Sequence, residues 1–263
     1  MYNAFFAGQF DVMELTLYAF FLFFFGLVLY LRREDRREGY PLEDEASGRH
    51  EPTPGFLWYA KPKTFVLPHG RGELSKPNAI RDDRELSARR SAVWSGAPLE
   101  PVGNPLKAGV GPGSYAQRAD KPDLMHGGEP RIAPLRIATT YSIAKEDPDP
   151  RGMTVVGADN GAVGVVSDIW VDRMEFMIRY LEIAVNGADG APSAKRILAP
   201  MTMAVVNKGK RTVRIEALLA AQFADAPTPA SPEQITLLEE EKIVAYFGAG
   251  YLYATPARSE PLL

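Results

Sequence analysis

The chain has 263 residues, 46% of them hydrophobic and 24% charged, a composition typical of one or two globular units and not of a disordered polymer. Its formal net charge of -3 gives no electrostatic reason to expect a nucleic-acid partner. It has no cysteine, so disulfides, thiolate chemistry and cysteine-ligated metals are excluded, and with 3 histidines an imidazole-rich metal site is not expected.

The first predicted element is a membrane-spanning helix. The segment from Leu15 to Leu31 reads LTLYAFFLFFFGLVLYL without a charge, and with Val12 and Met13 it approaches the roughly 20 residues that cross a bilayer. A cleavable signal peptide is the alternative, but no basic residue precedes the segment and no small-x-small cleavage site follows it. We therefore expect a tail over residues 1–11 and a retained transmembrane helix over residues 12–35.

Charges flank this predicted helix unevenly. Asp11 and Glu14 lie at its start, whereas four arginines at the membrane interface follow its apolar run: Arg32, Arg33, Arg36 and Arg37. The positive-inside rule therefore predicts a periplasmic N-terminus and places everything after residue 32 in the cytoplasm.

Residues 36–134 are unusually rich in proline, with 13 of the chain's 22 prolines between Pro41 and Pro134. Regular helices and central strands do not tolerate that density. A disordered tether is one interpretation, but apolar and aromatic residues recur, and they favour an extended segment lying on a partner surface. These residues are Phe56, Trp58, Tyr59, Phe65, Val66, Leu67, Trp94 and Tyr115.

After Pro150 the pattern changes to short β-rich runs separated by turns. Asp159-Asn160-Gly161 lies between two such runs and is a strong hairpin signal. Further strands are expected over residues 176–185, 196–199, 203–206 and 212–217. Five or six short strands within about 65 residues predict a small antiparallel barrel, which we place at residues 135–230.

A short C-terminal helix is predicted in residues 231–263. Ser231 suits the N-cap, Pro232 the first turn and Gln234 the capping-box position. The run ITLLEEEKIVAYF continues the helix, and Gly248 and Gly250 are expected to end it. The predicted fold is thus one N-terminal transmembrane α-helix, an extended proline-rich segment, a mainly-β cytoplasmic domain and a short helix.

The candidate chemistry lies in the stretch SDIWVDRMEFMIRYLE. Strand parity puts Asp168, Trp170 and Asp172 on one face, and residues 173–175 are expected to turn the chain. Carboxylates near an arginine, here Glu175 near Arg179, can have pKa values separated by burial and charge, as a proton relay requires. The residues alone favour a solvated barrel face, with the relay as the alternative.

Two other motifs give weaker indications of a binding site. Gly109-Val-Gly111-Pro-Gly113 lacks the lysine and serine of a phosphate-binding loop and indicates a turn. His126, with Asp123 and Glu129, could hold a surface metal, but a lone histidine in a loop favours plain solvation. No nucleophile, metal set or cofactor loop follows from the spacing, so an enzyme is not expected.

The sequence resembles the H subunit of the photosynthetic reaction centre of purple bacteria. Five blocks carry the resemblance and cover nearly the whole chain in order: YLRREDRREGYPLE (residues 30–43), PKTFVLPHGRG (62–72), GNPLKAGVGPGSYAQR (103–118), SDIWVDRMEFMIRYLE (167–182) and ITLLEEEKIVAYFGAGYLYATP (235–256).

The resemblance implies a single-pass subunit of the inner (intracytoplasmic) membrane that caps the cytoplasmic face of the L and M subunits and contains a PRC-type barrel. It implies no cofactor bound by this chain alone, because bacteriochlorophyll, bacteriopheophytin, quinones and non-haem iron are held by L and M. Membrane lipids are expected contacts, and a cytochrome subunit or light-harvesting ring in the complex is left open. The competing hypothesis is a membrane-anchored PRC-barrel adaptor that binds a soluble protein partner.

The resemblance also implies a part in proton transfer to the secondary quinone. Reduction to quinol needs two electrons and two protons at a site buried from water, so ionisable groups must lead to it. The family's key carboxylate after DIWVD matches Glu175, and Asp172 and Arg179 match neighbouring positions on the same path. Asp168 of the same polar set is a further candidate.

One departure from the family concerns proton entry. Some members carry two surface histidines just before the segment equivalent to Ile132-Ala133-Pro134-Leu135, whereas this chain reads LMHGGEPRIAPL with His126 alone. The resemblance therefore gives no two-histidine zinc site here, and His126 is a candidate participant in proton entry beside nearby carboxylates.

Overall fold

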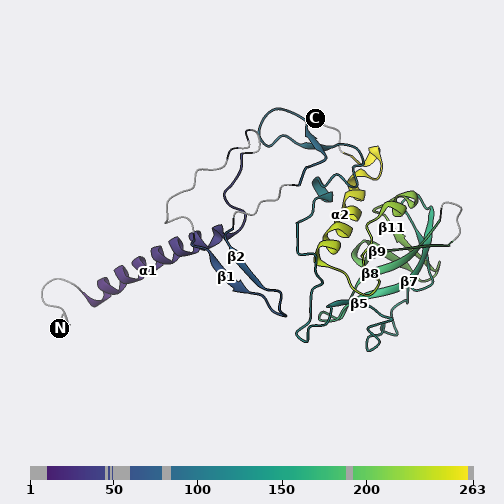
Figure 1. The fold of residues 1–263 in the computed structure, drawn as a ribbon, viewed down its shortest axis with the longest axis horizontal. Helices are drawn as coiled ribbons and strands as arrows, with labels where there is room; N and C mark the ends of the chain where they lie inside the picture. The colour runs from purple at the N-terminus through teal and green to yellow at the C-terminus, as the bar shows by residue number, and fades with distance from the viewer. Residues whose placement is uncertain are drawn as a thin grey trace. The chain divides into compact units, whose positions relative to one another are not determined.

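The computed structural model describes residues 11–44, 47, 49, 60–78, 84–187 and 192–259. It divides into two compact units, one of Met1–Asp82 with Val93–Ala97 and one of Asp83–Ala92 with Pro98–Leu263 (Figure 1). The predicted tail, apart from Asp11, lies outside the described residues, as do Phe56, Trp58 and Tyr59 of the proline-rich segment.

The first unit begins with the predicted apolar helix, α1 (Val12–Glu34). The Asp11 side chain caps it by accepting a hydrogen bond from the backbone N–H of Met13 at 3.2 Å. Its 23 residues extend over about 34 Å, enough for a hydrocarbon layer of about 30 Å. An 18-residue stretch of this helical span has a mean hydropathy of 2.2 and α1 has no buried residue, so the helix is long and apolar enough to cross a membrane.

The proline-rich segment contains short hairpins that the sequence did not predict. In the first unit, β1 (Lys63–Val66) pairs antiparallel with β2 (Glu73–Lys76). In the second unit, β3 (Ala88–Arg90) pairs with β4 (Leu99–Pro101). Pro62, Pro68 and Pro77 flank β1 and β2 without entering them, which is how two strands form in so proline-rich a stretch.

A seven-stranded sheet forms the body of the second unit (Figure 1). The strand order is β10-β11-β6-β7-β8-β9, and β5 pairs with β7. The strands are β5 (Ile132–Pro134), β6 (Thr154–Val156), β7 (Ala162–Asp172), β8 (Met177–Asn186), β9 (Pro192–Pro200), β10 (Ala204–Asn207) and β11 (Thr212–Ile215).

These strands confirm the predicted mainly-β domain. The hairpin at residues 159–161 joins β6 to β7, and Asn160 adopts the positive φ of 60° that such a turn requires. One pairing differs from the wholly antiparallel expectation, because β6 and β11 run parallel. These two strands are far apart in the sequence, so no hairpin turn fixes their relative direction.

The short helix α2 (Leu237–Tyr253) packs its apolar side chains into the same core as the sheet. Ile243 and Phe247 are fully buried, and the Phe247 ring meets Phe223 edge-on with 5.8 Å between centroids. Trp170 of β7 and Tyr180 of β8 are the largest buried side chains of the sheet.

The predicted start of this helix is wrong. The N-cap is Thr236, whose Oγ1 accepts from Glu239 N at 3.1 Å while Glu239 Oε2 accepts from Thr236 N at 2.9 Å. Thr236 and Glu239 thus form a complete, reciprocal capping box. Ser231 Oγ accepts from Glu233 N at 3.2 Å, in the turn before α2, and does not cap the helix.

The predicted end is also wrong, since Gly248 and Gly250 lie inside α2. A Cβ atom on Gly250 would be 2.2 Å from the carbonyl oxygen of Ala217, and one on Gly248 would be 2.9 Å from that of Pro112. Both glycines therefore allow the helix to approach neighbouring backbone and do not stop it.

Candidate functional site

The four polar residues that the sequence singled out in SDIWVDRMEFMIRYLE fall into two clusters. Asp168 and Asp172 are four residues apart on β7, which places their Cα atoms about 13 Å from each other along an extended strand. Two register shifts in the β7–β8 pairing, one between Val166 and Asp168 and one between Trp170 and Val171, also break the simple alternation of faces.

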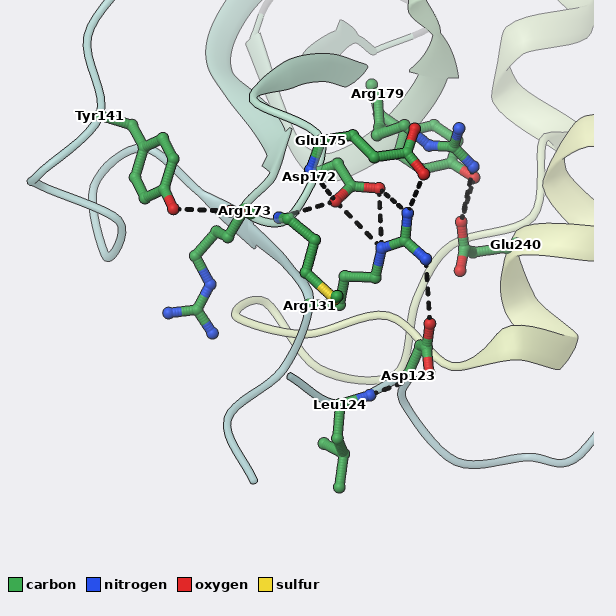
Figure 2. Close-up of polar contacts among 11 residues, drawn as sticks. Asp123, Leu124, Arg131, Tyr141, Asp172, Arg173, Glu175, Arg179 and Glu240 are labelled. Carbon is green, nitrogen blue, oxygen red and sulfur yellow. Dashed lines mark hydrogen bonds and ion pairs between the residues drawn. The ribbon is translucent and has the colours of Figure 1, made fainter. Parts of the chain in front are cut away.

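The first cluster is centred on Arg131 and is shown in Figure 2. Its guanidinium contacts Asp172 through Nε, at 3.0 and 2.9 Å to the two carboxylate oxygens, and through Nη2 at 2.8 Å. The same Nη2 pairs with Glu175, and Nη1 lies 3.4 Å from Asp123 Oδ2. One arginine thus holds three carboxylates from two segments of the chain, Asp123 from one and Asp172 and Glu175 from the other.

Local structure explains why these groups meet. Strand β5 pairs with the end of β7 so that Ile132 lies opposite Asp172, which brings the preceding Arg131 beside that carboxylate. Asp172 Oδ1 accepts from the backbone N–H groups of Met174 and Glu175 at 3.0 and 3.1 Å, which fixes the turn at residues 173–176. The predicted turn over residues 173–175 is thereby confirmed.

The electrostatics of Asp172 follow from this geometry. Asp172 is fully buried, and burial by itself would raise the pKa of its carboxyl group. Hydrogen bonds from Arg131 and from the backbone of Glu175 and Met174 outweigh burial and hold the pKa below its ordinary value. The expectation of a solvated barrel face is therefore wrong here, because Asp172 is buried and kept ionised by its donors.

A cleft separates the Arg131 cluster from a second group of polar residues, which lie on β8 and α2. Tyr180 donates its hydroxyl hydrogen to Glu240 Oε2 at 2.8 Å, and Arg179 Nη2 lies 3.8 Å from the same oxygen. Burial raises the pKa of Glu240, against the opposing effects of its bond from Tyr180 and the charge of Arg179. Arg118 and Glu241 complete this side of the cleft with a 3.5 Å ion pair.

These residues surround a polar cleft of about 240 Å³ that is lined by Asp172, Arg179, Arg131, Glu240 and others. The cleft is large enough for several water molecules and is rich in polar partners for them. It contains one carboxyl group with a lowered pKa, Asp172, and one with a raised pKa, Glu240. Such an arrangement can hold and exchange protons.

Asp168 lies in the second cluster, around the buried carboxylate of Glu182. Arg136 Nη1 bridges Asp168 at 2.9 Å and Glu182 at 2.8 Å, and Arg196 donates to Glu182 at 3.0 Å. Trp170 Nε1 donates to Glu182 at 3.0 Å. Burial alone would raise the pKa of Glu182, but its bonds from Trp170 and Arg136 lower it.

The structure places the other sequence-predicted residues outside the cleft. His126 is exposed in a turn closed by a 2.8 Å bond from Met125 N to the Glu129 carbonyl oxygen. Within the part of the chain that the structure describes, no group of three or more histidines, aspartates and glutamates is positioned to hold a metal. A role of His126 in proton entry stays a prediction.

The interface arginines lie at the end of α1. Arg32 and Arg33 are in its last turn, and Arg36 and Arg37 are in the short 3-10 turn η1 (Asp35–Arg37) that follows. The Arg37 guanidinium donates to Glu34 at 2.7 and 3.0 Å, which fixes its side chain against the last turn of α1.

Sequence reasoning missed Arg131, Tyr180 and Glu240 as members of the site. Arg131 precedes β5 and Glu240 lies on α2, so neither is near Asp172 in the sequence. The run Glu239-Glu240-Glu241 was a visible signal, because an apolar helix that buries one face against a core must turn some of three successive acids toward other protein groups.

Two family models match the chain. One describes the N-terminal region of the photosynthetic reaction centre H-chain and matches residues 4–137, about half of the sequence. The other describes the PRC-barrel domain and matches residues 144–222, which contain strands β6 to β11.

Proposed function

The chain belongs to the photosynthetic reaction centre H-chain family, and we propose that it caps the cytoplasmic face of the L and M subunits and supports proton transfer to the secondary quinone. The family is a structural subunit of a photosynthetic complex and associates with its other subunits. In this proposal α1 anchors the chain in the inner membrane with its N-terminus in the periplasm, and the sheet domain stands in the cytoplasm.

The observation that carries the proposal is the graded exposure of the three carboxylates around Arg131. The side chain of Glu175 is 54% exposed, that of Asp123 is 38% exposed and that of Asp172 is 1% exposed. Two carboxylates that reach water, Glu175 and Asp123, thus pair with a guanidinium whose position the buried Asp172 fixes, and they form the water-facing part of a proton route. A buried quinone, held by the partner subunits, requires such a route because its reduction to quinol consumes protons.

The residues have different parts in this route. Asp172 stays ionised because its pKa is lowered, so it fixes the orientation of Arg131 and does not carry protons near neutral pH. Glu175 does not line the cleft itself, but it reaches water and pairs with Arg131, which does, so we assign proton exchange to Glu175. Arg179 keeps a positive charge beside Glu240 on the other side of the cleft. Asp168 and His126 lie outside this cleft and are not needed for the route.

Replacing Glu175 tests the proposal. Glu175→Gln keeps the shape of the side chain but removes the group that exchanges protons. In the purified complex, flash kinetics should show proton-coupled transfer of the second electron to the secondary quinone slowed roughly 100-fold, with transfer of the first electron little changed.

The matched control is Glu146→Gln, the same chemical change at an exposed loop residue outside the cleft. The control should behave like the parent in both electron transfers. Parent-like rates of the second transfer in Glu175→Gln would remove Glu175 from the route and leave the chain with a structural part only.

The competing membrane-anchored adaptor fits the barrel match alone. The match over residues 4–137 supports the reaction-centre subunit instead, because it includes the helix and the proline-rich segment as well. Extraction of the native chain in mild detergent should recover it with pigmented partner subunits. A colourless preparation containing this chain and a soluble partner would favour the adaptor.

A further inference from the structure

We propose that the β1–β2 hairpin is a membrane-surface element that binds the phosphate groups of anionic phospholipids. Lys63 and Lys76 supply the charge, and Phe65 and Leu74 supply the apolar contact with the interface. The inference goes beyond the role in proton transfer and does not depend on it, since the hairpin belongs to the first unit and the cleft to the second.

The hairpin is tied to the end of the membrane helix by one side chain. The Nη1 atom of Arg37 donates to the carbonyl oxygens of Lys61 and Lys76, both at 2.9 Å, while Nε donates to Glu34 in the last turn of α1. These bonds join the open end of the hairpin to the end of a helix that is long enough to span the bilayer (Figure 1). The base of the hairpin is therefore held at the depth of the lipid headgroups.

The two faces of the hairpin differ in chemistry. Residues opposite each other in an antiparallel pair share a face, as do residues two apart on one strand. Lys63 pairs with Lys76 and Phe65 with Leu74, so one face combines two cations with an aromatic and an aliphatic group. The other face is lined by the pairs Thr64–Ser75 and Val66–Glu73, and Thr64 and Ser75 share a 2.9 Å hydrogen bond.

In the described part of the chain, both faces of the hairpin are open to solvent, so the choice of the basic face rests on its chemistry. Phe65 is 41% exposed and Leu74 is 39% exposed, although both are large apolar residues. The Nζ of Lys63 stands 5.9 Å from the centroid of the Phe65 ring. Lys76 lies 3.8 Å from Glu38, whose side chain is 74% exposed, so this pair is weak, and the Lys76 side chain, 28% exposed, is partly open to an anion.

The excess of basic residues in the hairpin segment indicates that anionic phospholipid occupies its basic face. Residues 60–78 contain four basic residues and a single acidic one, Glu73, in a chain whose overall net charge is -3. Basic residues next to aromatic and aliphatic ones, at the end of a membrane helix, match an interface of anionic phosphates above acyl chains. A protein surface on a partner subunit is the competing occupant, and the experiment separates the two.

The absence of cysteine allows single labelling sites in the full chain. Leu74→Cys and Ser75→Cys place a polarity-sensitive fluorophore on the two faces, and Leu22→Cys reports the middle of α1. Each labelled chain is inserted, without partner subunits, in nanodiscs of phosphatidylglycerol and phosphatidylcholine. Quenching is measured with a lipid-borne nitroxide and with aqueous iodide.

The label at residue 74 should be quenched by the lipid-borne nitroxide and protected from iodide, and the label at residue 75 should show the reverse. Equal iodide quenching at both positions, with the label at residue 22 still protected, would overturn the proposal. Protection of residue 74 only after partner subunits are added would also overturn it and would assign this face to a protein.

The charge requirement is tested by Lys63→Gln/Lys76→Gln in the residue-74 labelled chain. Each lysine near an anionic surface strengthens binding to that surface about fivefold. Loss of both lysines should therefore lower the ratio of lipid-bound to water-exposed hairpin roughly 25-fold. Lys208→Gln/Lys210→Gln, an equal loss of charge in the β10–β11 turn, is the control and should leave the ratio unchanged. An unchanged ratio in the hairpin variant would refute binding to anionic headgroups.

Discussion

The two clusters of carboxylates and arginines on β7 and β8 contain the same residue types but differ in how far their carboxylates reach toward water. Around Glu182, the carboxylate is 3% exposed and its acceptor atoms are used by Arg136, Arg196, Ser167 and Trp170. Around Arg131, the cation is central, and its acceptors range from a buried carboxylate to one that reaches water.

This difference separates a structural cluster from one suited to chemistry. Glu182 also lines a cavity, of about 480 Å³, but its acceptor positions are taken by fixed donors that hold it ionised, so it serves stability. The cleft around Arg131 keeps an exposed carboxylate and a second carboxyl group, Glu240, whose pKa burial raises. Groups with pKa values displaced in opposite directions are typical of proton-transfer sites.

The largest expected effect is on stability and comes from the Glu182 cluster. Glu182→Leu leaves the indole N–H of Trp170 without its acceptor and Arg136 with one carboxylate fewer, which should lower the free energy of unfolding by about 3–5 kcal/mol. Urea unfolding of the full chain in detergent, followed by tryptophan fluorescence, measures it. Glu146→Leu, at an exposed loop position, should change stability by less than about 0.5 kcal/mol. Equal stability of the two variants would contradict the structural assignment.

A smaller effect is expected from one hydrogen bond of the cleft. Tyr180→Phe keeps the buried ring but removes the hydroxyl that donates to Glu240, so the free energy of unfolding should fall by about 1 kcal/mol. The same urea titration measures it. Tyr251→Phe, at a half-exposed ring on α2, is the matched control. A loss as large as that of Glu182→Leu would show that the cleft is as structural as the other cluster.

The smallest effect concerns the pH dependence of stability, which should have opposite signs in the two clusters. Glu182 has a lowered pKa, so its stabilising contribution is present above the ordinary value of 4.5 and is lost as the pH falls through its folded-state pKa. Glu240 has a raised pKa, so its contribution is present below 4.5 and is lost as the pH rises through its folded-state pKa.

Glu240→Gln tests the predicted sign of the pH dependence of stability at Glu240. The variant has no carboxyl group to ionise, so its stability relative to the parent should increase from pH 4.5 to neutral pH. Unfolding titrations at both pH values measure the difference. Glu182→Gln should show the opposite trend in a lower window, losing stability relative to the parent as the pH rises to 4.5 from below the folded-state pKa of Glu182. Trends of the same sign in the two variants would refute the contrast.

Much of the architecture was predictable from local patterns. The uncharged run before Arg32, the turn at Asn160 and the β-rich runs up to residue 217 are confirmed as α1 and the strands of the sheet. The resemblance to the reaction-centre H subunit is confirmed by the family match. The errors at α2 are informative, because the capping box at Thr236 and Glu239 was readable in the sequence, whereas the packing role of Gly250 was not.

The candidate site was only partly predictable. Asp172, Glu175 and Arg179 could be named because they lie within eight residues of one another. Asp168 was grouped with them because strand parity predicted that it shares a face with Asp172, but it lies in the other cluster. Parity fails where β-bulges shift the register and where a strand is covered on both faces. The sequence also gave no sign that Arg131 was the centre of the cluster.

The sequence by itself determined the apolar helix α1, the strands after residue 150 and the existence of a C-terminal helix, because these depend on hydrophobic runs, short-range periodicity and turn residues. The tertiary structure alone decided which carboxylates share an arginine and which reach water. Pairing β5 with β7 sets Arg131 beside Asp172, and docking α2 on the sheet sets Glu240 against Tyr180. Burial and charge partners depend on such long-range contacts, so the contrast between the two clusters exists only in the folded chain.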